Sequence, residues 1–431
     1  MDHAIDEQWC EAIRRRKANT INDLIEDGFD VNVRTRDMTI ERQQPALQIA
    51  IRRSHLQIEH HKFWDWLVRI LLRAGADPMK GRDLTCVQTC IHSGYTNTLW
   101  DMIHISKIDI TDKIHCERDG TTPAMTAVAN SDAKLLELLI YSKVDLMAVN
   151  KRYEGVLHVA TDSNLIAIIL DHLKSDQNLI AFMDLQDNDG NTALHNACIS
   201  HNVDVCKQLI KFGADTTLVN LRGNTLLHQL VDPVVTATRN WPWYGHQSQS
   251  MLLYMLLGGG ISVHQVNTDG NSCLHLAVIG SFSLLIYPLL AEGAKPDDKD
   301  LHGRTCFHLA VMCKDGPYDW KPLDALLDHR KFRNGNLEIK DNDGLTTLLL
   351  AAQIRRVDVI DRLCEKGADV KAQDRQGNTA LALATRSRAY LIVNKLLEHG
   401  SYIRQKKTRW TGSMGYCNDS YRSTSERMGP D

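Results

Sequence analysis

The chain has 431 residues, of which 43% are hydrophobic and 24% are charged, and its formal net charge is −3. This composition is typical of a well-packed protein, and the near balance of charge argues against binding driven by nucleic-acid phosphates. The longest apolar stretch, residues 251–257, is far shorter than the roughly 20 residues of a membrane span, and the acidic N-terminus lacks a secretory signal. We therefore expect no nucleic-acid or membrane partner, and a location in the cytoplasm or the nucleus.

One short string recurs along the chain, most completely as Thr192-Ala193-Leu194-His195, and a glycine precedes each copy. The separation of these glycines returns repeatedly to 33 residues, as between Gly190 and Gly223. The series is Gly120, Gly155, Gly190, Gly223, Gly270, Gly303, Gly344 and Gly377. A constant period of about this length indicates a repeat architecture built from one supersecondary unit.

Each part of the repeat predicts a local structure. Residues 187–190 predict a tight turn, because glycine and short polar side chains adopt backbone geometry that other residues resist. Thr192 is placed to cap the first helix, in which Leu194 faces the core. Leu209 recurs at helical spacing in a second helix, which Gly213 ends.

The segment from Asp187 to Asp215 resembles the ankyrin-repeat family, whose motif Asp-x-x-Gly-x-Thr-x-Leu-His-x-Ala it carries almost intact. The resemblance implies an all-α ankyrin-repeat solenoid of helix–turn–helix units joined by short β-hairpin fingers. It also implies that the motif histidines form structural hydrogen bonds between neighbouring hairpins rather than act in catalysis. These histidines are His158, His195, His228, His275 and His308.

Counted in chain order by this template, about eleven repeats form one elongated domain over residues 1–405. They are placed at residues 5–38, 39–80, 81–114, 115–150, 151–185, 186–218, 219–265, 266–298, 299–339, 340–372 and 373–405. The first three are identified only from their second-helix endings, and erosion of terminal repeats is expected because they face water on one side. The repeat at 151–185 is irregular, and we expect its second helix to be short.

Three insertions interrupt the period, near residues 52–66, 232–250 and 314–322. We expect all three to leave from the turn between the two helices of a repeat and so to lie on one edge of the solenoid. Tryptophan and tyrosine are common interface anchors, so the aromatic residues of the insertions are candidate partner contacts. The alternative is that their rings fold back and cap helix ends. The candidates are Trp64, Trp241, Trp243, Tyr244, Tyr318 and Trp320.

The hairpin fingers, with the exposed side of the first helices, form a second candidate surface. Its variable positions have no common charge, so they indicate no dedicated acidic or basic ligand. They include the partner-binding candidates Arg222, His302 and Arg375, together with Thr268 and Asn342.

Chemistry-bearing motifs are scarce. The sequence has no phosphate-binding glycine loop, no paired-histidine metal motif and no nucleophile elbow. Cys86, Cys90 and His92 are the only local cluster with metal-ligand residue types, but the spacing is not that of a zinc knuckle. We expect most of the cysteines to be core residues, and we expect no catalytic residue, no metal and no cofactor.

After Gly400 the periodic pattern ends, and residues 406–431 predict a basic, disordered tail. The whole chain predicts a non-catalytic scaffold or adaptor, favoured as a monomer, that binds one or more proteins through the concave ankyrin surface and the aromatic insertions. Two alternatives stay open. One is an enzyme or small-molecule-binding protein with a site on the aromatic insertions, and the other is a regulatory subunit of a separate catalytic partner.

Overall fold

The structure is a computed structural model, and its described residues form two compact units. Unit 1 comprises residues 1–301 and 315–329, and unit 2 comprises residues 302–314 and 330–431. The residues that the structure describes are 2–32, 34–37, 42–56, 61–80, 84–108, 110, 119–232, 245–313, 322–329 and 337–400. The expected tail at 406–431 lies outside them.

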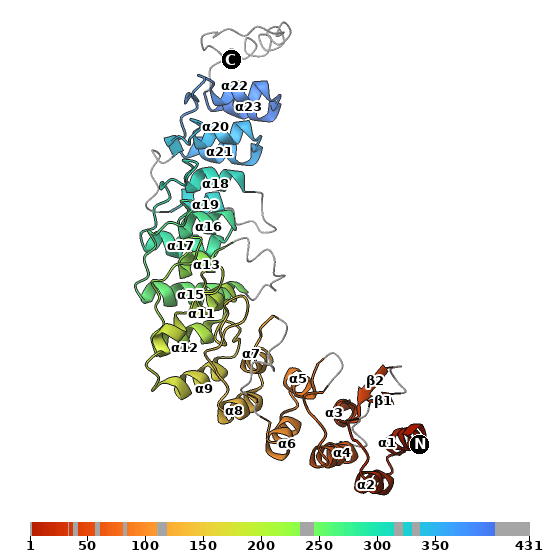
Figure 1. The fold of residues 1–431 in the computed structure, drawn as a ribbon. Coiled ribbons are helices and arrows are strands. Elements are labelled where there is room, and N and C mark those ends of the chain that lie inside the picture. Colours follow the sequence, from red (N-terminus) through yellow and green to blue (C-terminus); the bar gives the residue numbers. More distant parts are fainter. Residues whose placement is uncertain are drawn as a thin grey trace, which may run out of the picture. The chain divides into compact units, whose positions relative to one another are not determined.

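Unit 1 is a succession of short helices joined by turns (Figure 1). Its helices are α1 Asp2–Arg15, α2 Ala18–Glu26, α3 Ala46–Leu56, α4 His61–Arg73, α5 Cys86–His92, α6 Thr96–Ser106, α7 Pro123–Ala129, α8 Ala133–Tyr141, α9 Ser163–Leu173, α10 Leu179–Met183, α11 Ala193–Ile199, α12 Val203–Phe212, α13 Leu226–Leu230, α15 Gly245–Gly258, α16 Cys273–Ile279, α17 Ser283–Ala291 and α19 Pro322–Leu327. Near the N-terminus, strands β1 Arg34–Asp37 and β2 Arg42–Pro45 pair antiparallel, with Arg34 opposite Pro45.

The helices of unit 1 are arranged in pairs, and successive pairs stack in two layers. Within a pair, α11 packs on α12 and α16 packs on α17. Between pairs, first helices contact first helices, as α3 with α5, α5 with α7 and α11 with α13. Second helices likewise contact second helices, as α4 with α6, α12 with α15 and α15 with α17. Each pair therefore buries its apolar face against its neighbours and not in one central core.

The sequence explains where each helix begins and ends. The Thr192 hydroxyl accepts a hydrogen bond from the His195 backbone N–H at 3.3 Å, so it caps the first turn of α11. Gly213 ends α12 with φ of +98°, a conformation that residues with a Cβ rarely adopt. Between these limits, Leu194 of α11 and Leu209 of α12 are buried in the contact between the two helices.

Unit 2 has the same construction. Its helices are α18 Cys306–Met312, α20 Thr347–Gln353, α21 Val357–Glu365, α22 Ala380–Arg386 and α23 Tyr390–Glu398. The first helices α18, α20 and α22 contact one another in order, and α21 packs beside α23. The all-α helix-pair architecture is thus confirmed in both units. The number of repeats stays a prediction.

Candidate interaction surface

Each finger is a tight turn held by one side chain. Asp187 Oδ1 accepts hydrogen bonds from the backbone N–H groups of Asp189 at 2.9 Å and Asn191 at 2.8 Å. Gly190 sits between them with φ of +76°. Equivalent bonds organise the fingers that begin at Asn220 and Asn267 in unit 1 and at Asp341 and Asp374 in unit 2. The two residues that follow this Asn or Asp are exposed in all five of these fingers.

Neighbouring fingers are joined by regular backbone hydrogen bonds. In unit 1 the Leu221 N–H donates to the Asp189 carbonyl at 3.1 Å, and the Thr268 N–H donates to the Arg222 carbonyl at 2.9 Å. The Leu301 N–H donates to the Asp269 carbonyl at 3.3 Å. Because each of these three fingers is tied to the one before it, their tips are held in place before any partner binds.

The motif histidines add a second set of bonds between neighbouring repeats. His195 Nδ1 accepts from the Thr192 backbone N–H at 3.3 Å, so its Nε2 carries the proton and donates to the Asn224 carbonyl at 3.3 Å. His158 and His228 of unit 1 repeat this arrangement, and so does His308 of unit 2. This confirms the structural role that the resemblance implied. His275 differs in one respect, because its Nε2 lies 3.1 Å from the carbonyl of Asp298.

Burial keeps the imidazoles of His158, His195 and His228 neutral. It lowers the pKa of His195 and of His228 to about 4, and it also lowers the pKa of His158. A neutral ring with both nitrogens committed to backbone groups is a poor general base, since proton uptake at Nδ1 would break the bond from the backbone N–H. The histidines therefore stabilise the fingers.

The finger tips of unit 1 are more apolar than predicted. Leu221 is 74% exposed and Leu301 is 65% exposed, and Val219 and Val266, which stand two residues before Leu221 and Thr268, are exposed as well. We call the following residues the finger edge: Val219, Leu221, Arg222, Val266, Thr268 and Leu301. Arg222 and Thr268 were predicted, whereas the four apolar residues were missed. Their signal was present, because Val219-Asn220-Leu221 places apolar residues on both sides of the turn residue.

In unit 2 the predicted finger residues are also exposed, but their surroundings are polar. His302, Asn342 and Arg375 are all exposed at finger tips. The Asn342 N–H donates to the His302 carbonyl at 2.9 Å, as in unit 1. The Lys340 ammonium donates to the Gln373 carbonyl at 2.7 Å. The fingers of unit 2 thus have the same backbone geometry with a more polar set of side chains.

Comparison with known proteins agrees with this geometry. The family model described as ankyrin repeats, in three copies, matches residues 157–232 and 322–407. The first match includes the finger that begins at Asp187 and the bonds that His158 and His195 make to the next finger. The chain contains ankyrin repeats.

Curated proteins with similar sequences match parts of this chain. The p105 subunit of nuclear factor NF-kappa-B from Gallus gallus is 27% identical over 166 residues, which are 38% of this chain and 15% of that protein. NF-kappa-B inhibitor alpha from Homo sapiens is 29% identical over 132 residues, 30% of this chain and 38% of that protein. Notch-regulated ankyrin repeat-containing protein B from Danio rerio is 50% identical over 40 residues, 9% of this chain and 36% of that protein. The chain therefore spans less than half the length of each of these relatives.

The irregular ankyrin repeat at 151–185 departs from the prediction. The turn residue there is Asn150, and the left-handed position that glycine occupies in the next finger is taken by Tyr153, with φ of +60°. Gly155, predicted to be the periodic glycine, instead occupies the position of the capping threonine, and its N–H donates to His158 Nδ1 at 3.1 Å. Without a capping hydroxyl, residues 156–159 form only turns. The second helix, α9, has 11 residues, so the expectation of a short second helix was wrong.

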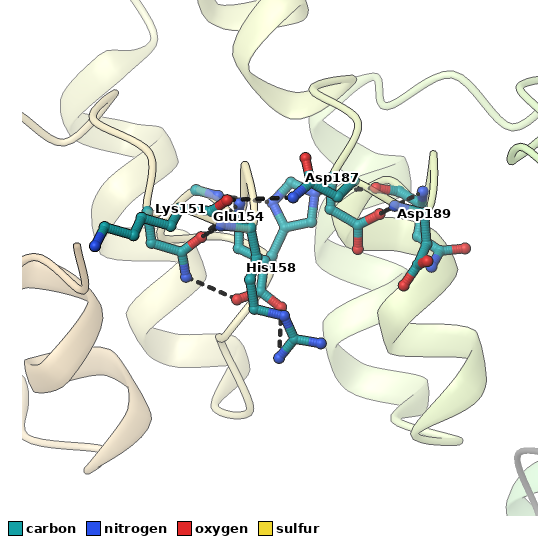
Figure 2. Close-up of polar contacts among 10 residues, drawn as sticks. Lys151, Glu154, His158, Asp187 and Asp189 are labelled. Carbon is teal, nitrogen blue, oxygen red and sulfur yellow. Dashed lines mark hydrogen bonds and ion pairs between the residues drawn. The ribbon is translucent and has the colours of Figure 1, made fainter. Parts of the chain in front are cut away.

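Figure 2 shows this finger beside the next one. Glu154 and His158 lie between the two fingers, with Asp187 and Asp189 on the far side, and the Lys151 side chain extends away from them. The Glu154 carboxylate accepts a hydrogen bond from the Asn150 amide at 2.7 Å. Tyr153 is 58% exposed at the tip. A bulky residue held in a left-handed conformation and exposed to solvent is an uncommon combination that backbone strain opposes.

The aromatic insertions are only partly described. Trp241, Trp243, Tyr244, Tyr318 and Trp320 lie outside the described residues.

Trp64 is described, and its position corrects the expectation of an exposed loop residue. It lies in α4 and is 1% exposed, with its ring edge-on to Phe63 and the Arg53 guanidinium 5.5 Å from the ring centroid. The insertion near 52–66 lengthens α3 and α4, to 11 and 13 residues, and within it Trp64 is buried whereas Phe63 and Trp66 are half-buried. A partner cannot contact Trp64 without displacing α4.

Metal and thiol chemistry finds no support in the described part of the chain. Burial raises the pKa of Cys86 to about 12 and raises that of Cys90 well above its usual value. Zinc binds the thiolate, so both positions disfavour it. Within the described ranges, no group of three or more His, Cys, Asp or Glu residues is arranged to hold a metal ion. No helix in these ranges combines the length and apolarity of a membrane span.

Proposed function

We propose that the chain is a non-catalytic protein-interaction scaffold or adaptor, and that the finger edge of unit 1 is one of its docking surfaces. The observation that carries the proposal is the exposure of Leu221 and Leu301 on rigid, hydrogen-bonded fingers. Exposed apolar residues grouped with polar ones are typical of protein-binding surfaces. Here Arg222 follows Leu221, and Thr268 lies on the finger between those of Leu221 and Leu301.

Rigidity supports the proposal. A surface already held by backbone hydrogen bonds loses little conformational entropy on binding, so a larger share of the contact energy appears as affinity. One relative is named as an inhibitor of another protein, NF-kappa-B, which is a role exerted on a protein. We propose protein partners for this chain on the same basis, with no nucleic-acid partner, a monomeric state and a location in the cytoplasm or the nucleus.

The remaining predicted contacts are part of the same proposal. The exposed finger residues His302 and Arg375 of unit 2 would extend recognition with polar contacts. Trp241, Trp243, Tyr244, Tyr318 and Trp320 are retained as proposed contacts of the insertions. Trp64 is withdrawn because it is buried.

Comparative affinity capture tests the finger edge. Three baits are compared by quantitative mass spectrometry from native lysate: the full chain, a Leu221→Glu and Leu301→Glu double variant, and a Leu391→Glu control. Leu391 is the matched control because it is also 65% exposed but lies on α23, away from the fingers. Each leucine that a partner buries contributes about 1.5 kcal/mol or more, so the double variant should lose captured proteins more than tenfold. Equal capture by all three baits, with all three folded, overturns the proposal.

A further inference from the structure

Helices α15 and α17 are unusual among the second helices because neither contains an Asp, Glu, Lys or Arg residue. The preceding second helix, α12, contains Asp204, Lys207 and Lys211. In unit 2, α21 contains four charged residues, Asp358, Asp361, Arg362 and Glu365, and Arg356 stands at its N-cap. A surface helix normally places such residues on the side that faces water.

The positions concerned are structurally equivalent in the three helices. Met251 and Tyr254 of α15 stand nine and six residues before Gly260, which has φ of +80°. Leu284 and Tyr287 of α17 stand at the same distances before Gly293, with φ of +99°. In α12 these positions, counted back from Gly213, hold an exposed ion pair between Asp204 and Lys207, with Nζ and Oδ1 3.8 Å apart.

The four apolar side chains are exposed and adjacent. The exposed fractions are 51% for Met251, 63% for Tyr254, 58% for Leu284 and 39% for Tyr287. α17 packs beside α15 in the layer of second helices (Figure 1), so the two pairs form one surface. We call these four residues the α15–α17 face.

The opposite side of α17 is already buried, so the exposed residues are not a misplaced core. Leu285, Ile286, Leu289 and Leu290 are the residues that α17 buries in its own unit. A helix that is apolar on all sides is normally covered on all sides. The α15–α17 face therefore has the character of a surface that another chain covers.

The size and charge of the face indicate what covers it. Large side chains bury about 150–250 Å² each, so the exposed parts of these four amount to roughly 400 Å². A stable interface between folded proteins buries about 800 Å² on each side, which is twice as much. The area suits one helix laid on two others. Because neither helix carries a formal charge, the contacting side of that helix must be uncharged as well.

We propose that the α15–α17 face binds one amphipathic helix of a partner protein through that helix's apolar side. Met251, Tyr254, Leu284 and Tyr287 are its contacts, arranged as an i, i+3 pair on each of two neighbouring helices. This surface lies on the second helices, whereas the finger edge lies on the turns that precede the first helices. The chain thus has two docking surfaces, and an adaptor needs two.

The probe is a phage-displayed library of 18-residue helices with Leu, Ile, Met, Phe or Tyr at positions i, i+3, i+4 and i+7, and Glu, Lys, Gln or Ala elsewhere. The full chain is the bait, and fluorescence anisotropy measures the affinity of the selected peptides. In the test variant, Met251→Asp with Tyr254→Lys and Leu284→Asp with Tyr287→Lys reproduce the ion pair of α12 on both helices. The matched control is Leu391→Asp with Tyr390→Lys on α23, where both residues are 65% exposed.

The proposal expects selected peptides that bind the full chain and the control variant equally and lose at least tenfold in affinity for the test variant. A single pair, Met251→Asp with Tyr254→Lys, gives an intermediate loss and keeps the test valid if the fourfold variant does not fold. The proposal is overturned if the library yields no binder, or if its binders ignore the test substitutions. It is also overturned if analytical ultracentrifugation shows the wild-type chain to dimerise and the test variant to be monomeric, since a second copy would then cover the face.

Discussion

The Leu221 side chain lies directly over Gly190 of the preceding finger. A Cβ on Gly190 would come 2.6 Å from the Leu221 backbone nitrogen and 3.0 Å from its Cγ. The same relationship joins Leu301 to Gly270, where a Cβ would meet the Leu301 nitrogen at 2.9 Å. The finger glycine is therefore required for contact with the next finger as well as for its own φ, and it supports the two leucines of the finger edge.

Comparison of alanine substitutions at Gly190 and Gly213 should separate these two roles. Gly190→Ala introduces both the positive-φ strain and the collision with a backbone atom, so we expect a loss of about 3 kcal/mol in the free energy of unfolding. Gly213→Ala is the control, because Gly213 has φ of +98° but nothing within 4 Å of an added Cβ. It should lose only about 1 to 2 kcal/mol. Equal losses, measured by urea denaturation, would show that the contact between fingers contributes nothing to the free energy of unfolding.

The buried histidines predict acid sensitivity. The pKa of His195 is about 4 in the fold and 6.5 in the unfolded chain. As the pH falls below 6.5, the unfolded chain takes up the proton at His195 first. The stability that the neutral His195 gives to the fold is therefore complete above pH 6.5 and is lost progressively toward pH 4. At pH 5 this histidine alone should lower the free energy of unfolding by about 2 kcal/mol. His228 should behave in the same way, because burial also lowers its pKa to about 4.

The variant His195→Gln isolates this effect. It should be less stable than the wild type at pH 7, because a hydrogen bond between repeats is lost, and the difference should shrink toward pH 5. Amide hydrogen exchange of α11 and α13 reports the local opening free energy without assuming that the whole chain unfolds in one step. A constant difference between pH 7 and pH 5 would contradict the assignment of a neutral His195.

Replacement of Tyr153 by glycine should stabilise the protein. Its φ of +60° costs a residue with a Cβ about 1–2 kcal/mol, and glycine avoids most of that cost. Tyr153→Gly should therefore raise the free energy of unfolding by about 1 kcal/mol, after allowance for the greater flexibility of glycine in the unfolded chain. Tyr153→Ala keeps the strain and should not stabilise. If both variants have the same melting temperature, Tyr153 is not strained.

Substitution of Trp64 should affect stability according to the size of the new side chain and not through the loss of a hydrogen bond. Its indole Nε1 is buried without a hydrogen-bond partner, so Trp64→Phe removes no bond and should cost about 1 kcal/mol. Trp64→Ala opens a cavity between α3 and α4 and should cost about 3–5 kcal/mol. Thermal denaturation followed by circular dichroism distinguishes the two. An alanine variant as stable as the wild type would contradict the burial of Trp64 between α3 and α4.

The amino-acid pattern alone was enough to predict the repeat, its helix pairs and the finger turns. Those features depend on residues close together in one copy of the motif: Asp187 bonds the turn that follows it, Thr192 caps the helix that begins beside it, and Gly213 ends the next helix. Such short-range chemistry recurs along the chain, and the repeat at 151–185, which lacks the capping hydroxyl, departs from it. The histidine bonds between repeats were implied by the family resemblance and not by the local pattern.

Which side chains are covered could not be predicted from the pattern and became known from the packing of the helices. The spacing around Gly155 concealed that Tyr153 takes the left-handed position, and an apolar insertion that was expected to form a loop buries Trp64 between two longer helices. In the same way, Leu221 and Tyr254 read as core residues by type and are exposed. Burial depends on which neighbouring repeat packs against a residue, and that neighbour is set by contacts some 33 residues away, as between His158 and Asn191. The sequence pattern within one repeat does not show which residues of the next repeat will cover it.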